Sequence, residues 1–589
     1  MTRLDPRTRQ PLSSVLRPPV GFRLDAAVGT TFTLDLRTLL AVPLTFALLD
    51  GVDIGAGDAS SGEDETPAAP VLLGALLAYA ERIRVLSDAR YISAPSRPSR
   101  LYALLEPTIV PTVVRVGAHF HPKFWLLRFV DEDSRPSHRL VLSTRNLTDD
   151  RSWDLVVVLE EDAAGVVGAA QPAIDLLRAT APEDAFIEDL TRSAASVRFL
   201  APPGFHELRL HAWSAGEGAD PMAGRSGSKM LVMSPFIGLD RLRALAAQSD
   251  QITVVSRPET FDRLAAGGAL PRADLRRLMD LAADDDGLSG ELHAKLVVLD
   301  EAGGRSRWWL GSLNATDNGV RRNAEALLEL TTSTAAGGVD ALLSTDGDRL
   351  GTLLEPHGIR PPSDDDDDDE GNQGEQALRQ ALAEGIWRVT VTPKPDGHLA
   401  ATLTVDWPEA RPDPEAKIRV GFASGRSADR LMLDLDAAHA EAQWPLVLLQ
   451  DVTSLLEVQV RRPAGDPFTL LVVAVLTVPD DQARHAALFR AIVPDVDVML
   501  RLILLLLTSG HDARSASAAA RALIDADGES ADVLPSLPLI EEMVRAYARD
   551  PDRLRRAGAV IAGLPRDDPR TEPLRALWDT FDAALAGRQ

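Results

Sequence analysis

The stretch "ELHAKLVVLD", residues 291–300, places a histidine and a lysine two positions apart inside a run of strand-forming residues. Alternate side chains of a strand share one face, so His293 and Lys295 are expected to point the same way. Ionisable side chains are seldom placed on a half-buried strand without a partner. The stretch therefore predicts a polar pocket beside a strand.

A second histidine-lysine pair occurs earlier in the chain, in "HFHPKFWLLRF" (119–129), which contains His121 and Lys123. After a turn-rich gap, each pair is followed by another strand candidate that ends in a polar turn with an asparagine. These turns hold Asn146 in "RLVLSTRNLT" and Asn314 in "RWWLGSLNAT". The spacing is that of a domain-sized repeat, and it predicts that the two sets of residues converge on one site.

A histidine, a lysine and an asparagine in one pocket suit phosphate chemistry. The lysine and asparagine donors hold the nonbridging oxygens and stabilise the charge that builds on them. A histidine can attack phosphorus or deliver a proton to a leaving oxygen. Two copies supply two histidines for opposite sides of one phosphate. Because the lysines take the place of a metal cation, no metal and no other cofactor is expected.

"HAKLVVLD", followed by "GSLN" and "NAE", resembles the phospholipase D superfamily, whose signature is His-x-Lys, four residues, Asp, and then Gly-Ser-x-Asn. The residues that match this signature are His293, Lys295, Asp300, Gly311, Ser312 and Asn314. Glu325 stands where the family often has a glutamate that orients a histidine. The resemblance covers about residues 25–335.

The first copy departs from this signature. Arg128 stands where the aspartate would be, and "STRN" replaces Gly-Ser-x-Asn, with Ser143 as a candidate phosphate ligand. Asp154 aligns with Glu325. The string "HPKFWLLRF…LVLSTRNLTDDRSWD" is similar to the tyrosyl-DNA phosphodiesterase branch of the superfamily, where the aspartate is also missing. That similarity favours a nucleic acid over a lipid as the substrate.

The resemblance implies an α/β fold with two pseudo-symmetric phospholipase D-like halves around one active site. It also implies metal-independent hydrolysis or transfer through a covalent phosphohistidine. His121 would be the nucleophile and His293 the acid, although some members exchange these roles. The predicted catalytic set is His121, Lys123, Asn146, His293, Lys295 and Asn314, and the predicted supporting set is Asp154, Glu325, Ser143, Ser312 and Asp300. Arg145 is predicted by its position to contact substrate at the pocket rim.

The composition sets limits on the class of protein. The net charge of -25 argues against wide, nonspecific binding of nucleic acid, although it leaves room for a locally basic cleft. The chain has no cysteine, which excludes disulfides, thiolate metal sites and a cysteine nucleophile. The N-terminus shows no apolar signal region, and the longest apolar run, 498–508, is too short to span a bilayer. We expect a buried helix there and a soluble, cytoplasmic protein that does not engage a membrane.

Pattern changes along the chain predict five regions. Two strand-helix-strand segments predict the first half at 1–200 and the second half at 201–360. The acidic stretch 361–385 is predicted to be a linker. Alternating strands at 386–480 predict a small β-sandwich, and amphipathic spacing at 481–589 predicts a helical domain.

Several alternatives remain open. A phospholipid hydrolase or phosphatidyl transferase would use the same residues, and a catalytically inactive scaffold would only bind phosphate. The pair His119 and His121 has the spacing of some metal ligands, without a companion cluster. The aspartate run 364–369 is a plain spacer or an acidic decoy for the cleft. By analogy with the family, a helicase or another defence or repair component is a candidate protein partner of the C-terminal regions.

Overall fold

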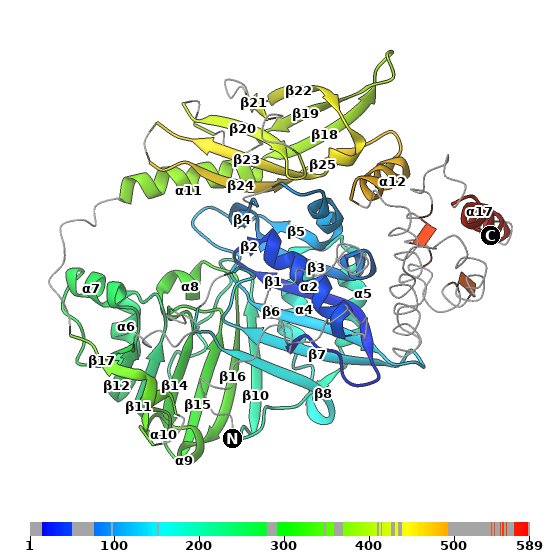
Figure 1. The fold of residues 1–589 in the computed structure, drawn as a ribbon. Coiled ribbons are helices and arrows are strands. Elements are labelled where there is room, and N and C mark those ends of the chain that lie inside the picture. The colour runs from blue at the N-terminus through cyan, green and yellow to red at the C-terminus, as the bar shows by residue number, and fades with distance from the viewer. Residues whose placement is uncertain are drawn as a thin grey trace, which may run out of the picture.

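The computed structural model describes most of the chain in ordered elements (Figure 1). The described ranges are 15–49, 76–95, 98–149, 152–279, 291–346, 349–358, 369–408, 412–413, 415–425, 430–433, 439–463, 465–492 and 571–586, with a few positions between 543 and 561. We refer to residues 15–200 as the first half, to 201–358 as the second half and to 369–492 as the C-terminal module. The architecture is mixed α/β with several sheets.

The first half is built on a seven-stranded sheet with the order β5-β3-β1-β6-β7-β8-β9. The strands are β1 (Arg23–Thr31), β3 (Ile83–Asp88), β5 (Ile109–Thr112), β6 (Phe124–Val130), β7 (Pro136–Ser143), β8 (Val156–Val167) and β9 (Arg198–Phe199). Strand β1 ends at Thr31, the two-residue strand β2 (Leu34–Asp35) follows, and α2 (Leu36–Leu49) begins directly after it. Asp35 caps this helix, because its carboxylate accepts the Thr38 N–H at 2.9 Å.

The second half is built on an eight-stranded sheet with the order β10-β16-β15-β14-β11-β12-β13-β17. The strands are β10 (Glu207–Trp213), β11 (Gly227–Met233), β12 (Ser249–Val255), β13 (Asp274–Leu278), β14 (Leu296–Glu301), β15 (Arg305–Gly311), β16 (Glu325–Ser333) and β17 (Leu354–Pro356). Helices α6 (Leu239–Ala246) and α7 (Pro258–Ala266) follow β11 and β12 in the chain. They pack apolar residues on the sheet, Leu242 and Phe261 among them.

Six strands of each sheet share one order and one set of directions. In the first half β5, β3 and β1 are parallel, and β6, β7 and β8 follow with antiparallel pairing. In the second half β13, β12 and β11 are parallel, and β14, β15 and β16 follow in the same way. Parallel neighbours need crossover connections, and helices and turns supply them in both halves. Residues immediately before β6 and β14 therefore occupy corresponding places in the two sheets.

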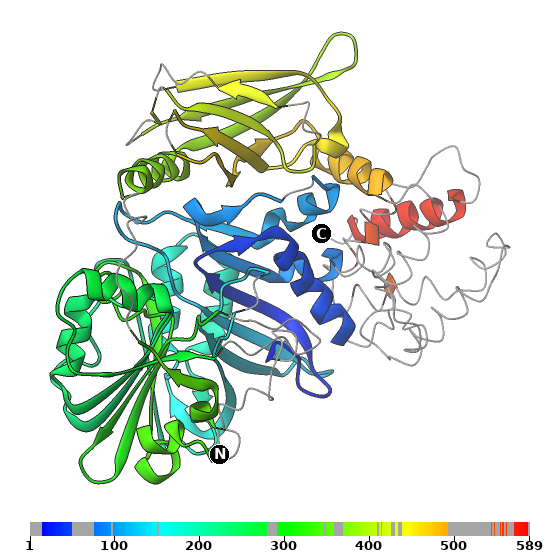
Figure 2. The ribbon, with the colours of Figure 1, turned by 60° about the vertical axis from the view of Figure 1, so that its left-hand side comes forward.

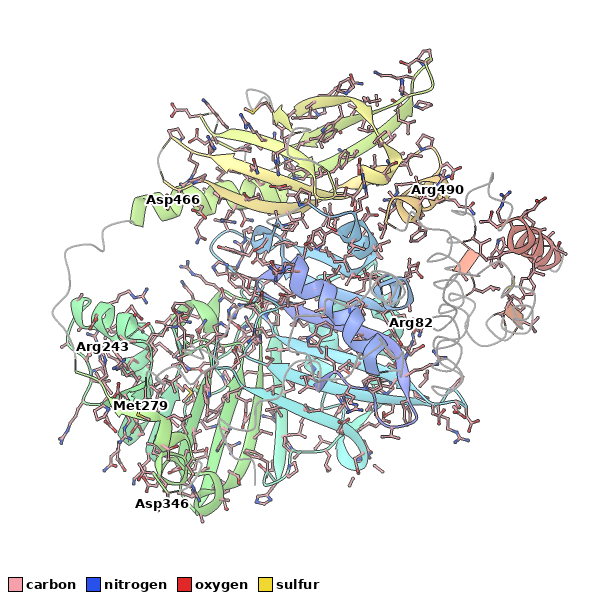
Figure 3. All side chains as sticks on the ribbon, viewed as in Figure 1. Arg82, Arg243, Met279, Asp346, Asp466 and Arg490 are labelled. Carbon is pink, nitrogen blue, oxygen red and sulfur yellow. The ribbon has the colours of Figure 1, made fainter. Side chains whose placement is uncertain are left out.

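The two halves share one apolar core. A single buried cluster contains Val28 and Leu126 of the first sheet together with Leu231, Leu296 and Leu328 of the second. Figure 3 draws the side chains on both sheets. Because burial of apolar area drives association, this continuity fixes the two sheets against each other. The segments of each half that reach the other half are therefore held in fixed positions.

The C-terminal module contains two four-stranded sheets around a common core. One sheet has β22 (His439–Val447), β19 (Leu399–Asp406), β18 (Ile386–Pro393) and β25 (Val475–Thr477); the other has β21 (Leu431–Leu433), β20 (Lys417–Phe422), β23 (Leu455–Arg461) and β24 (Phe468–Val473). The region expected to be a linker differs from that expectation, because α11 (Asp369–Glu384) occupies most of 361–385. Leu378 and Leu382 bury one face of α11 in the module's core. The aspartates 364–368, and with them the decoy hypothesis, lie outside the described residues.

The C-terminal module lies against the first half, away from the second (Figures 1 and 2). Leu455 and Leu471 of the module, with Phe489 of α12 (Asp481–Ile492), join a buried cluster that also contains residues of α2 and β1. Arg484 of α12 donates to both carboxylate oxygens of Glu106 at 3.0 Å. The module is therefore fused to the first half by apolar burial and by a buried ion pair.

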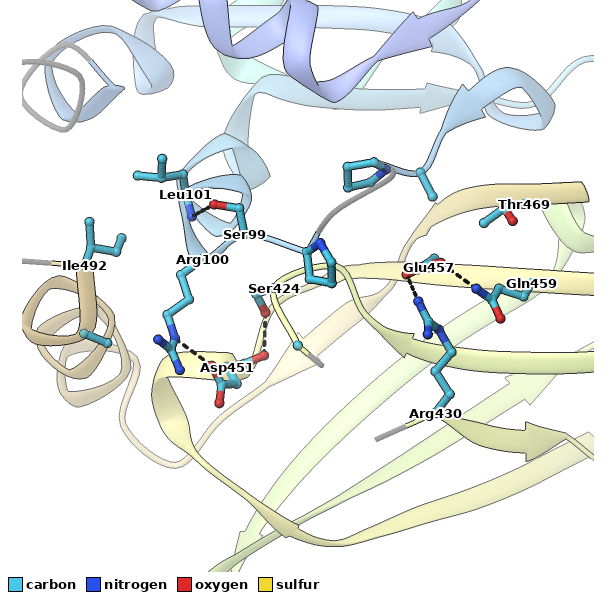
Figure 4. Close-up of a pocket in the computed structure, with 15 residues that line it drawn as sticks. Ser99, Arg100, Leu101, Ser424, Arg430, Asp451, Glu457, Gln459, Thr469 and Ile492 are labelled. Atoms are coloured by element: carbon cyan, nitrogen blue, oxygen red, sulfur yellow. Dashed lines mark hydrogen bonds and ion pairs between the residues drawn. The ribbon is translucent and has the colours of Figure 1, made fainter. Parts of the chain in front are cut away.

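A cavity of about 880 Å³ opens between the first half and the C-terminal module (Figure 4). Two arginines project toward it, and each is paired with a carboxylate of the module. Arg100 donates to Asp451 at 2.7 Å, and Arg430 lies 2.5 Å from Glu457. Because both guanidinium charges are balanced, the cavity presents no surplus of positive charge.

The predicted C-terminal helical region is described only in part. Two helices are described there, α12 and α17 (Glu572–Ala586). The apolar run 498–508, predicted as a buried helix, lies outside the described residues. Within the described ranges, no helix is both long enough and apolar enough to cross a membrane.

Candidate active site

The His121–Lys123 segment enters the first sheet immediately before β6, so these two residues precede the strand instead of lying on it as predicted. The segment is anchored to the second half. The His121 N–H donates to the Ala324 carbonyl at 3.1 Å, and the Ala324 N–H donates to the His119 carbonyl at 2.9 Å. The Lys123 ammonium donates back to the His121 carbonyl at 3.0 Å. This bond brings the ammonium close to the histidine before any ligand is bound.

The second histidine-lysine segment has the same construction in reverse. His293 and Lys295 precede β14, and the His293 N–H donates to the Trp153 carbonyl of the first half at 3.0 Å. The Trp153 N–H donates to the Glu291 carbonyl at 2.9 Å. The Lys295 ammonium donates to the His293 carbonyl at 2.7 Å. Each half therefore holds the histidine segment of the other.

The carboxylates that orient the histidines are exchanged between the halves. Nδ1 of His121 lies 2.9 Å from Oε2 of Glu325, at the start of β16 in the second half. Nδ1 of His293 lies 2.8 Å from Oδ1 of Asp154, which precedes β8 in the first half. A carboxylate only accepts, so each Nδ1 carries a proton and each Nε2 keeps a lone pair. Both rings are thus set in the tautomer that presents Nε2.

Hydroxyl groups fix each carboxylate in turn. Ser312 donates to Oε2 of Glu325, and Thr144 and Ser152 donate to Asp154 at 2.8 and 2.7 Å. Burial alone would raise the pKa of Asp154, but the hydrogen bond and charge of His293, together with these hydroxyls, lower it to about 2. Burial would likewise raise the pKa of Glu325, and His121 lowers it instead. Both carboxylates are therefore ionised at neutral pH.

Burial sets the protonation of the two histidines. It is the main reason that the pKa of His121 falls from 6.5 to about 3, and the charges of Lys123 and Lys295 add to that fall. Burial also lowers the pKa of His293, with Asp154 opposing the change and both lysines adding to it. The His121 side chain is 8% exposed and that of His293 is 15% exposed. In the free protein His121 is therefore neutral at pH 7, and His293 is the more accessible of the two rings.

The two lysines place positive charge in the same buried region. Lys123 and Lys295 are both almost fully buried. Burial lowers the pKa of Lys123 well below its usual value, and the charge of Lys295 lowers it further. Each histidine is bonded to a carboxylate of the other half, and each lysine donates to the carbonyl of its own histidine, so the four side chains lie where the two halves meet. Such a site gains most from an anion that neutralises both ammonium groups.

The predicted asparagines end the two neighbouring strands. Asn146 follows β7 and Asn314 follows β15. The turns that hold them are alike, because Leu147 N–H donates to the Thr31 hydroxyl at 3.0 Å and Ala315 N–H donates to the Ser234 hydroxyl at 3.1 Å. Oδ1 of Asn146 is buried, and no hydrogen-bond partner is found for it in the described structure.

Of the remaining predicted residues, Ser143 and Arg145 lie near the site, and Asp300 lies away from it. Ser143 accepts the Arg145 N–H at 2.9 Å, so its hydroxyl shapes the turn before Asn146. Arg145 is half-buried, and its guanidinium lies 3.8 Å from Asp154. Asp300 lies at the far end of β14 from the site, where it accepts from Ser306 at 2.6 Å and from the Val339 N–H at 3.2 Å. The structure places it away from the histidines, as an anchor for the helix that begins at Val339.

Arg128, the residue that replaces the aspartate in the first copy, also anchors a helix. It donates to Asp189 at 2.8 Å and to Ser193 at 3.2 Å, both on α5 (Ala185–Ala194). It also pairs with Asp25 on β1 at 2.5 Å. Arg128 therefore anchors a helix in the first half, as Asp300 does in the second half. Arg128 and these partners take no part in the candidate site.

Among the described residues, no group of three or more His, Asp or Glu side chains is arranged to hold a metal ion. The alternative role of His119 as a metal ligand thus gains no third ligand in that part of the chain. Its ring lies against Phe32, with ring centroids 5.1 Å apart, and its Nδ1 lies 3.2 Å from the guanidinium of Arg90.

No protein-family model matches the chain, and no curated protein matches it. Among solved structures, the yeast tyrosyl-DNA phosphodiesterase matches with a TM-score of 0.34 and 11% identity, over 56% of this chain and 87% of that one. A mutant of the same yeast enzyme matches with a TM-score of 0.34 and 12% identity, over 53% and 84% of the two chains.

Sequence reasoning missed the residues that support the site from behind. Thr144 lies next to Ser143, and Ser152 lies two residues before Asp154. Hydroxyl residues are common in turns, so neither gave a distinct signal. Asp88 is the last residue of β3, Arg257 lies two residues after β12, and each fixes a histidine segment. Asp88 accepts the Phe120 N–H at 3.0 Å, and Arg257 donates to the Leu292 carbonyl at 2.8 Å. Their shared position at the ends of matching strands was the available signal.

Proposed function

We propose that the protein is a metal-independent phosphodiesterase that acts on nucleic acid through a covalent phosphohistidine. The observation that carries the proposal is the exchange of carboxylates, in which Glu325 orients His121 and Asp154 orients His293. This arrangement gives two imidazoles with free Nε2 atoms beside two buried ammonium groups. The resemblance of the first motif to the tyrosyl-DNA phosphodiesterase branch supports nucleic acid as the substrate class.

The first step uses His121 as the nucleophile. Its Nε2 lone pair attacks phosphorus, an N–P bond forms, and the bond from phosphorus to the leaving oxygen breaks. His293, in its imidazolium form, gives its Nε2 proton to that oxygen. The low pKa of His121 keeps it unprotonated and ready to attack. The Nδ1 proton stays on the ring and keeps its hydrogen bond to Glu325. The carboxylate therefore stabilises the positive charge that the ring carries while it is bonded to phosphorus.

The second step returns the enzyme to its first state. Neutral His293 takes a proton from a water molecule, whose oxygen attacks phosphorus while the N–P bond breaks. Lys123, Lys295, Asn146 and Asn314 are the donors that hold the nonbridging oxygens throughout. Because these ammonium groups are buried, their interaction with the phosphoryl charge is stronger than it would be in water.

The test is cleavage of labelled single-stranded and double-stranded DNA and RNA in the presence of EDTA. Wild-type protein should cleave at least one of them, and His121→Ala and His293→Ala should abolish the cleavage. His211→Ala is the matched control, because His211 pairs with Glu329 at 2.7 Å outside the site. Absence of cleavage of every nucleic acid, with turnover of phospholipid vesicles instead, would assign the site to lipids.

Trapping separates an enzyme from an inactive scaffold. His293→Asn lacks the base of the second step, so with a substrate whose leaving group needs no acid it should accumulate radiolabelled phosphate on the protein, stable to alkali and labile to acid. The label should disappear in the double variant His121→Ala, His293→Asn. Label that persists on the double variant would move the nucleophile elsewhere. Binding of nucleic acid without any label or turnover would favour a scaffold.

A further inference from the structure

A buried ion pair lies directly behind His121 and has no part in the chemistry just described. Asp88 ends β3, and Arg90 lies on the short helix η2 (Ala89–Tyr91) that follows. Nε of Arg90 donates to Oδ1 of Asp88 at 2.8 Å, and its Nη2 donates to Oδ2 at 2.5 Å. Asp88 is fully buried and Arg90 is 4% exposed. Buried charges on this scale are retained only with several good partners.

The pair holds the segment that carries His121. Oδ2 of Asp88 accepts the N–H of Phe120, the residue before His121, at 3.0 Å. Nη2 of Arg90 also donates to the Ala118 carbonyl at 2.6 Å. The backbone on the N-terminal side of His121 is thus fixed by the ion pair, while Ala324 fixes His121 itself from the second half.

A further partner of Arg90 comes from the C-terminal module. Nη1 of Arg90 donates to Oε1 of Gln380 on α11 at 2.9 Å. Nε2 of Gln380 donates to the Val114 carbonyl at 2.9 Å, and Arg379 donates to the Arg90 carbonyl at 3.1 Å. Gln380 is 3% exposed, so these bonds are shielded from water.

The second histidine has no such connection in the described structure. Arg257 occupies the place in the second half that Asp88 has in the first, and its side-chain bonds there go to Leu292 and Glu291 of its own half. The link to the C-terminal module is therefore specific to His121. This difference sets apart two histidine segments that are otherwise built alike.

We propose that Gln380 is a positioning residue for His121, acting through Arg90 and Asp88. The C-terminal module is then a working part of the candidate site and sets the geometry of the nucleophile. The inference rests on the proposed function for its kinetic reading, and on the position of the His121 ring for a reading that needs no turnover.

The experiment compares two glutamine substitutions on one helix. Gln380→Met keeps the length of the side chain and removes the oxygen that Arg90 needs. Gln376→Met makes the same change on the exposed face of α11. We expect Gln380→Met to lower kcat about tenfold with KM unchanged, as for loss of a bond to a charged group. Gln376→Met should match the wild type.

Proton NMR of the full chain provides the second reading. The Nδ1–H of His121, hydrogen-bonded to Glu325, should give a downfield signal that His121→Asn removes. This signal should shift or broaden in Gln380→Met, whereas the corresponding signal of His293 should not. If Gln380→Met does not fold, Gln380→Asn, which shortens the reach of the amide, serves for both readings.

The two readings separate the two proposals. An unchanged kcat and an unchanged His121 signal in Gln380→Met would overturn the positioning role and leave the proposed function intact. A wild type without turnover, together with a His121 signal that depends on Gln380, would overturn the function and leave the positioning role intact.

Discussion

Nδ1 of His121 is bonded to Glu325, a carboxylate that lies 204 residues further along the chain and in the other sheet. Glu325 is fully buried, and it also accepts from Ser312 and Asn323. A carboxylate with three donors has one orientation, and that orientation fixes the ring of His121. The position of the proposed nucleophile in one half is thus determined by residues of the other.

Glu325→Gln should lower kcat roughly 10- to 100-fold, because a partner that orients a catalytic ring then offers an amide in place of a carboxylate. KM should change little, since Glu325 is proposed to touch the ring and not the substrate. Steady-state kinetics on a cleaved oligonucleotide would measure both. Glu329→Gln, which alters the His211 pair outside the site, should keep its kcat. Equal losses in both variants would show a general structural effect.

The pH dependence of kcat/KM should be a bell with its maximum below pH 6.5. His121 must be unprotonated to attack, and its pKa of about 3 sets the acid limb. His293 must be protonated to act as the acid, and burial lowers its pKa from 6.5, so the alkaline limb begins below that value. Initial rates at low substrate concentration from pH 3 to 9 would reveal both limbs. A maximum above pH 8 would contradict the assignment of His293 as the acid.

Stability should fall as the pH is lowered from 6.5 toward 3, in part because of His121. The unfolded chain binds a proton at this histidine below pH 6.5, whereas the folded protein binds it only near pH 3. Within that window the unfolded state gains about 1.4 kcal/mol per pH unit from this group. Urea denaturation at several pH values would give the free energy of unfolding at each pH. This free energy should change less steeply with pH in His121→Asn than in the wild type. Identical slopes would mean that the ring is solvated.

Inorganic phosphate or vanadate should raise the Tm of the wild type, since either anion would neutralise the buried ammonium groups. Lys123→Met should lose this rise and lower kcat on the order of 100-fold. Without ligand, the Tm of Lys123→Met should equal or exceed that of the wild type, because the substitution removes a buried amine. Lys229→Met, which removes a lysine paired with Asp340 on the surface, should keep the response to phosphate.

Glu106→Gln should destabilise the protein by about 3 kcal/mol, because it removes the buried carboxylate that faces Arg484 and leaves that guanidinium with Asp481, a more exposed partner. The midpoint of urea denaturation should fall accordingly. Asp406→Asn breaks an exposed pair with Arg388 and should leave that midpoint unchanged. A matching, small effect of both substitutions would show that the apolar contacts alone hold the C-terminal module in place.

The residues of the candidate site could be named from the sequence, whereas the pairing between residues of the two halves could not. His121, Lys123, His293 and Lys295 could be named because two short motifs repeat the same residue types at the same spacing. The crossing of Asp154 and Glu325 depends on how two sheets pack, and no local pattern encodes that packing. Both carboxylates were recognised, but not which histidine each of them serves.

The contribution of the C-terminal module was hidden for a different reason. The acidic and polar residues of 361–385 favour a solvated linker by composition, yet Leu378 and Leu382 are spaced to bury one face of a helix. Gln380 lies between them and carries no charge to mark it. A buried glutamine is noticed only once its partner, Arg90, is known to lie across the interface.

The exchange of carboxylates also has a consequence for the chain as a polymer. Neither sheet, expressed by itself, would contain a complete histidine-carboxylate couple, so each fragment alone should be inert. Mixing the two fragments should restore both couples at once, as happens when two incomplete subunits assemble. A chain with a single copy of this unit would therefore need a second molecule of itself before either couple could form.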